Sequence, residues 1–101
     1  MTIPTQLVLR ALVESDEAYG AQLGAQTHLP SGTVHPILAR LEGIDWVTSR
    51  WEDIDPTTEG RPARRYYRLT REGRAQAEAA LDRSTRHVQV SAAPRLLGGM
   101  S

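Results

Sequence analysis

The clearest pattern in the chain is an apolar stripe within the stretch from Leu29 to Val47. Four aliphatic residues recur there at the i, i+3, i+4 and i+7 spacing of one helix face: Val34, Ile37, Leu38 and Leu41. Ser31 precedes the stripe and is a favoured N-cap residue. Gly43 follows it, and glycine can adopt the left-handed conformation that ends a helix. The sequence therefore predicts a short amphipathic helix between these two residues.

The opposite face of this predicted helix is small and polar and has no carboxylate. Its residues are Gly32, Thr33, His35 and Ala39. A helix this short must pack on a larger body through its stripe, which leaves the polar face exposed. Such a face could enter the major groove of DNA. We expect Pro36 to distort the first turn without breaking the helix.

Two further helices precede this one. Ile3 to Val13 carries apolar residues on one side, with Pro4 in the first turn, where its missing amide is harmless. Ala18 to Gln26 predicts a second, short helix, and we interpret its Gly20 and Gly24 as positions of close packing. A short turn joins this helix to the next. The pattern is that of a helix-turn-helix, whose second member reads the DNA groove.

After the central helix the periodicity changes from helical to extended. Trp46 to Asp53 and Ala63 to Thr70 are rich in β-forming residues, and Ile54 to Pro62 between them contains two prolines and a glycine. These stretches predict a β-hairpin with a long, mobile tip. Thr70 can then cap a last helix, from about Arg71 to Val88.

The predicted fold is mainly helical with a β-hairpin wing, the winged helix-turn-helix plan. We expect residues 1–70 to form the DNA-binding domain, residues 71–90 a C-terminal dimerisation helix, and residues 91–101 a disordered tail. The last helix has one weakly apolar edge, which we expect to contact a second copy of the chain, aided by the first helix. The residues expected in this dimer interface are Leu7, Ala77, Leu81, Ser84 and Val88.

The net charge is zero at pH 7, but the charges are unevenly distributed. From Asp45 to Glu59 there are five acids and one arginine, whereas from Arg61 to Arg74 there are six arginines and one glutamate. The chain contains no lysine, so its basic side chains other than histidine are all arginine. The planar guanidinium of arginine suits phosphates and guanine edges. A GC-rich genome would also favour arginine over lysine. The pattern predicts wing contacts to phosphates or the minor groove through Arg61, Arg64 and Arg65.

Other classes of protein find little support in the sequence. With 101 residues the chain suits one domain, and without cysteine it can form no disulfide. The three histidines lie on separate elements without metal-ligand spacing, so we expect no metal. No nucleophile–base–acid set or phosphate-binding glycine loop stands out, so we expect neither an enzyme nor a cofactor. The absence of a membrane-length apolar run and of a signal-peptide start favours a cytoplasmic protein.

Several motifs together resemble the PadR-like transcriptional regulators. In chain order they are YG at Tyr19, SGTVHPILARLEGIDWV from Ser31, WED from Trp51 and RPARRYYRLTREG from Arg61. The resemblance spans Leu7 to about Leu81. It implies a winged-helix repressor that binds DNA as a homodimer, with much of the dimer contact made by the C-terminal helix. The short C-terminus is similar to the branch of the family with a single terminal helix.

The sequence departs from the family pattern at two positions of the central helix. His35 stands where members commonly carry tyrosine, and Ala39 stands where a lysine commonly precedes the arginine. We therefore expect one DNA contact to differ and another to be lost. Arg40 matches the pattern, either as an ion-pair former or as a DNA ligand. Some relatives bind flat aromatic ligands between tryptophans of paired terminal helices, but no tryptophan follows Trp51 here, so the sequence does not indicate a small-molecule inducer.

The leading hypothesis is a homodimeric repressor that binds a near-palindromic double-stranded DNA operator. The residues expected to contact DNA are Tyr19, Ser31, Gly32, Thr33, His35, Arg61, Arg64 and Arg65. The alternative is a winged-helix module that docks on a protein partner through the acidic stretch from Asp45 to Glu59, with little or no specific DNA binding. The salt dependence of binding distinguishes the two, because phosphate contacts weaken steeply as salt rises.

Overall fold

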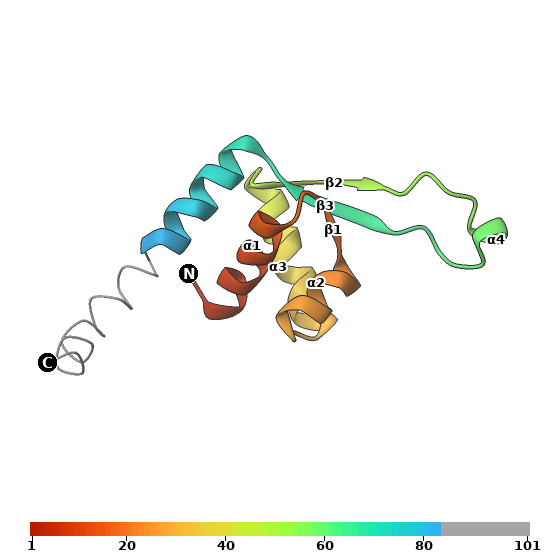
Figure 1. The fold of residues 1–101 in the computed structure, drawn as a ribbon, viewed down its shortest axis with the longest axis horizontal. Coiled ribbons are helices and arrows are strands. Elements are labelled where there is room, and N and C mark those ends of the chain that lie inside the picture. The colour runs from red at the N-terminus through yellow and green to blue at the C-terminus, as the bar shows by residue number, and fades with distance from the viewer. Residues whose placement is uncertain (84–101) are drawn as a thin grey trace, which may run out of the picture.

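Three helices pack together and a β-hairpin projects from them (Figure 1). The computed structural model describes residues 1–83. The helices of the body are α1 (Ile3–Glu14), α2 (Gly20–Thr27) and α3 (Ser31–Gly43). Residues 71–83 are also helical, and we call them the C-terminal helix. None of these helices combines the length and the apolar character that crossing a membrane requires.

The sheet has three antiparallel strands in the order β1–β3–β2. They are β1 (Ala18–Tyr19), β2 (Val47–Trp51) and β3 (Arg65–Leu69). The hairpin of β2 and β3 is the predicted wing. Its tip contains one helical turn, α4 (Pro56–Glu59), which Asp55 caps by accepting the N–H of Thr57 at 3.0 Å. The predicted mainly helical fold with a wing is therefore confirmed.

One apolar core joins all these elements except α4. Its buried side chains are Val8, Leu9, Ala11, Leu12, Ala18, Leu23, Val34, Ile37, Leu38, Leu41, Val47, Tyr67, Leu69 and Ala77. The whole predicted stripe of α3 lies in this core, so the orientation of that helix is confirmed. Burial of large side chains of this kind is the main favourable term in folding.

The core also corrects the predicted dimer interface. Ala77 is fully buried within its own chain and cannot face a second copy, so its assignment to the interface is wrong. Leu7 is 37% exposed on α1, and Leu81 is half-buried. Ser84, Val88 and the predicted tail lie outside the described residues.

Strand β1 replaces the start of the predicted second helix. Ala18 pairs with Tyr67, and Tyr19 pairs with Tyr66. This ladder satisfies backbone groups that a helix start would leave without partners. Long-range pairing therefore prevails over helix propensity, and α2 begins at Gly20, two residues later than expected.

The N-terminus of α3 is capped by Pro30 instead of Ser31. Pro30 is extended, and its carbonyl accepts the N–H groups of Thr33 at 2.9 Å and Val34 at 3.1 Å. Ser31 is the first helical residue, and its hydroxyl makes no capping hydrogen bond. The predicted capping role of Ser31 is therefore wrong, because the chain enters the helix one residue earlier.

The C-terminus of α3 is closed by Asp45 in the left-handed conformation (φ 62°), whereas Gly43 is still helical. The N–H of Asp45 donates to the carbonyl of Glu42 at 3.1 Å, and that of Trp46 donates to Leu41 at 3.0 Å. These two bonds form a Schellman motif. The predicted role of Gly43 is wrong because the motif forms two residues later, where Trp46 packs against the core.

The C-terminal helix begins against the turn that follows α3. The hydroxyl of Thr70 accepts the N–H of Gly73 at 3.0 Å, which confirms the predicted cap, and donates to the carbonyl of Asp45 at 2.7 Å. A Cβ atom on Gly73 would lie 1.9 Å from the carbonyl oxygen of Trp46. The helix can approach this closely only because residue 73 has no side chain.

We therefore expect Gly73→Ala to destabilise the fold by about 1–3 kcal/mol, the usual cost of overpacking. Urea denaturation followed by circular dichroism measures the change. Gly43→Ala is the matched control, since nothing lies within 4 Å of its added Cβ. This control should be neutral or stabilising because alanine favours a helix over glycine. Equal free energies of unfolding for the two variants would contradict the packing argument.

Candidate nucleic-acid interface

The outward face of α3 is exposed and free of unpaired carboxylates. Its exposed residues are Ser31, Gly32, His35, Pro36, Ala39, Arg40 and Gly43, and Thr33 beside them is half-buried. The one carboxylate of this helix, Glu42, is half-buried and already bonded. It accepts the hydroxyl of Ser49 at 2.6 Å and the guanidinium of Arg65 at 3.3 Å. The predicted polar face therefore exists as an accessible surface.

His35 connects this face of α3 to the first turn of α2. A Cβ atom on Gly20 would lie 2.8 Å from Cε1 of the His35 ring. A side chain at position 20 would displace this ring, so Gly20 leaves room for His35 to lie against the start of α2. The contact brings the face of α3 next to the junction of β1 and α2, where Tyr19 lies.

Tyr19 belongs to a row on one face of the sheet, in which two adjacent rings lie between two guanidinium groups. Its ring meets that of Tyr66 edge-on, with centroids 5.5 Å apart and an interplanar angle of 80°. The guanidinium of Arg64 lies 4.4 Å from the Tyr19 centroid, and that of Arg50 lies 5.1 Å from the Tyr66 centroid. We call Arg64, Tyr19, Tyr66 and Arg50 the arginine–tyrosine row. Such contacts favour a cation over an aromatic face.

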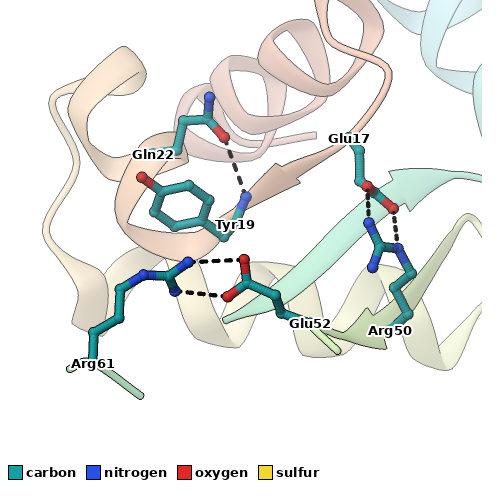
Figure 2. Close-up of polar contacts among 6 residues, drawn as sticks. All are labelled: Glu17, Tyr19, Gln22, Arg50, Glu52 and Arg61. Atoms are coloured by element: carbon teal, nitrogen blue, oxygen red, sulfur yellow. Dashed lines mark hydrogen bonds and ion pairs between the residues drawn. The ribbon is translucent and has the colours of Figure 1, made fainter. Parts of the chain in front are cut away.

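Carboxylates hold one arginine of this row, Arg50, and the nearby Arg61 (Figure 2). Arg61 donates two hydrogen bonds to Glu52, at 2.7 and 3.0 Å. Arg50 donates two to Glu17, at 2.6 and 2.8 Å. Paired bonds of this geometry are the strongest that arginine makes with a carboxylate.

The same pairs change the pKa values of the acids. The hydrogen bonds from Arg61 lower the pKa of Glu52 from 4.5 to about 2, and the N–H of Arg64, which donates to the same carboxylate at 3.2 Å, adds to the effect. The guanidinium of Arg50 holds the pKa of Glu17 below its usual value. Both acids are therefore ionised at neutral pH and neutralise the arginines that they bind.

The three predicted wing arginines have different surroundings. Arg61 is paired with Glu52. Arg65 donates to Ser49 at 3.0 Å and to Glu42, and its guanidinium also lies over the rings of Trp51 and Tyr67. Among residues 1–83, Arg64 is the one of the three that makes no ion pair. These pairings could not be predicted from the sequence, because the acids lie on other elements.

Arg40 lies apart from the wing. It forms no ion pair within residues 1–83. It lines an apolar hollow of about 310 Å³ together with Ile37, Ile44 and Trp46. The family pattern leaves two roles open for Arg40, ion-pair former and DNA ligand. The structure gives no support to the role of ion-pair former.

Comparisons with known proteins agree with this fold. The family described as "Transcriptional regulator PadR-like family" matches residues 8–79. The chain is similar to the PcaV transcriptional regulator from Streptomyces coelicolor, solved in complex with its natural ligand, with a TM-score of 0.75 and 28% identity over 93% of this chain and 62% of that one. No curated protein matches the sequence.

Two other solved structures share the fold at lower identity. A probable transcriptional regulator from Pseudomonas aeruginosa has a TM-score of 0.76 and 23% identity, over 99% of this chain and 75% of that one. The MarR family transcriptional regulator SPO1453 from Silicibacter pomeroyi has a TM-score of 0.65 and 24% identity, over 98% and 62%. The chain thus spans 62% of the length of both PcaV and SPO1453.

The low pKa of Glu52 predicts a pH-dependent contribution to stability. A folded-state pKa of about 2, below the usual 4.5, means that ionised Glu52 stabilises the fold above about pH 4.5. This contribution is lost as the pH falls from 4.5 towards 2. We expect Glu52→Gln to lower Tm at pH 7, and the difference from the wild type to shrink over that interval. Asp53→Asn, at the exposed neighbouring position, is the control. A Tm difference for Glu52→Gln that stays constant with pH would refute this.

Proposed function

Since the chain belongs to the transcriptional regulator PadR-like family, whose pattern matches residues 8–79, we propose that it is a cytoplasmic repressor that binds a near-palindromic DNA operator as a homodimer. The observation that carries the proposal is one accessible surface. It runs from the carboxylate-free face of α3, through the contact of His35 with Gly20, to Tyr19 and Arg64 of the arginine–tyrosine row. A surface that combines polar groups with an unpaired cation is suited to the bases and phosphates of DNA.

We assign the major groove to the N-terminal half of α3. In a helix-turn-helix, the first residues of the second helix contact base edges. The hydroxyl of Ser31 is exposed and makes no cap, and a Cβ on Gly32 would meet nothing within 4 Å. Thr33 and His35 complete this set. The first N–H groups of a helix lack intrahelical partners and suit a phosphate oxygen, which supports the same orientation.

We assign dimerisation to α1 and the C-terminal helix. The first turn of the C-terminal helix is held against the turn after α3 by Thr70 and Gly73, so its direction relative to α3 is defined. Two copies joined through these helices would place two α3 helices about one DNA turn, or a multiple of it, apart. A single reading helix contacts few base pairs, and the second copy supplies the missing affinity.

The first test is the salt dependence of DNA binding. We expect the protein to shift DNA from upstream of its own gene, and its affinity to fall steeply between low and high salt because counterions are released from the phosphates. Random DNA of equal length is the control for specificity. Absence of binding at low salt, or affinity that does not change with salt, would contradict the proposal and favour the protein-docking alternative.

The second test is Ser31→Ala. Because this hydroxyl makes no cap, the variant should keep the Tm of the wild type. We expect it to lose about 1–3 kcal/mol of operator affinity, the range for a base contact, with little change on random DNA. Ser15→Ala, at the far end of α1, is the matched control. Fluorescence anisotropy measures both affinities. Unchanged operator binding by Ser31→Ala would remove this residue from the interface.

The third test concerns the dimer. We expect the wild type to sediment as a dimer at micromolar concentrations, and Leu7→Glu to sediment as a folded monomer because a carboxylate buried in an interface without a partner is costly. Ala21→Glu, at an exposed position of α2, should remain dimeric. A monomeric wild type, or a dimeric Leu7→Glu protein, would contradict the assignment.

A further inference from the structure

The wing arginines differ in whether a carboxylate neutralises their charge. The carboxylate of Glu52 neutralises Arg61 through two hydrogen bonds. Arg65 is bonded to Glu42 and Ser49 and lies over two rings. Binding a DNA phosphate with either arginine would require these contacts to be exchanged. Both arginines are therefore suited to holding the wing against β2 and α3.

The guanidinium of Arg64 contacts an uncharged ring and is not neutralised by an ion pair within residues 1–83. It stacks on the face of Tyr19 at 4.4 Å. The backbone of Arg64 is fixed separately. The Arg64 N–H donates to a carboxylate oxygen of Glu52 at 3.2 Å, and its carbonyl accepts the N–H of Glu52 at 2.7 Å. A cation restrained in this way loses little freedom when it binds an anion.

Tyr19 is itself held from several directions. Its backbone pairs with Tyr66 in the sheet, and its ring meets the Tyr66 ring edge-on. Its N–H donates to the side-chain oxygen of Gln22 at 3.4 Å (Figure 2). The next residue, Gly20, contacts His35 on α3. The Tyr19 ring is therefore held by the wing, next to the point where α2 meets His35 of α3.

On the basis of the proposed function, we propose that Arg64 makes the DNA contact of the wing and that Tyr19 is its positioning residue. The ring of Tyr19 offers the Arg64 guanidinium a fixed, uncharged support beside α3. Arg61 does not bind DNA in this arrangement. Its charge is neutralised by Glu52, whereas the backbone of Arg64 is held by Glu52 itself. A phosphate of the DNA backbone or the acceptor edge of a minor groove supplies the anionic partner.

The test compares salt slopes, the change of log affinity with log salt concentration. Arg64→Ala should weaken binding to operator and random DNA about tenfold and lower the magnitude of the slope by about one, the effect of one lost phosphate contact. Tyr19→Leu should have the same effect, and the double variant should bind no more weakly than Arg64→Ala alone. Tyr19→Phe, which keeps the ring, should restore wild-type binding. A wild-type slope for Arg64→Ala, or additive losses in the double variant, would overturn the proposal.

The paired variant Arg61→Gln with Glu52→Gln tests the division between the arginines. It keeps the net charge and an acceptor for the Arg64 N–H, so the salt slope should equal that of the wild type. A slope reduced by about one would show that Arg61 binds a phosphate. This comparison decides the assignment even if Tyr19→Leu does not fold. Absence of salt-dependent binding by the wild type would instead refute the proposed function, so the two failures are distinguishable.

Discussion

The antiparallel pairing of β1 with β3 joins the helices of this protein to its wing. β1 has only two residues, but they pair with Tyr66 and Tyr67 in the central strand of the sheet. Through this pairing Ala18 enters the core, and Tyr19 comes to lie beside Arg64. The helix-turn-helix and the hairpin are therefore one unit, because the strand that starts α2 also fixes the base of the wing.

Charge neutralisation inside the molecule explains how a chain of zero net charge can present a surface suited to DNA. Three acids that would repel phosphates are bonded to arginines: Glu17 to Arg50, Glu42 to Arg65 and Glu52 to Arg61. The exposed face of α3 has no unpaired carboxylate, and Arg64 keeps its charge. Arg50 and Arg65 also lie over aromatic rings of the sheet, and these contacts restrain the wing further.

Close backbone approach determines how the remaining elements are placed. Gly20 lets the His35 ring lie against α2, and Gly73 lets the C-terminal helix start against the carbonyl of Trp46. The first contact places the His35 ring of α3 beside the start of α2. The second fixes the direction of the helix that we assign to dimerisation. Of the two glycines, Gly73 is the one that backbone contact requires, and it sets where the helix that we assign to dimerisation begins.

Local patterns in the sequence determined the three helices, the hairpin, the buried stripe of α3 and the cap at Thr70, because periodicity and capping depend on neighbouring residues. They also indicated which face of α3 is exposed. Only the tertiary structure decided the strand at Ala18 and Tyr19, the burial of Ala77 and the Schellman motif at Asp45. It also decided which arginines are neutralised, since Arg50 and Glu17 are 33 positions apart and Arg65 and Glu42 are 23 apart. Such partners come together only when the chain has folded, so their spacing along the sequence does not predict the contact.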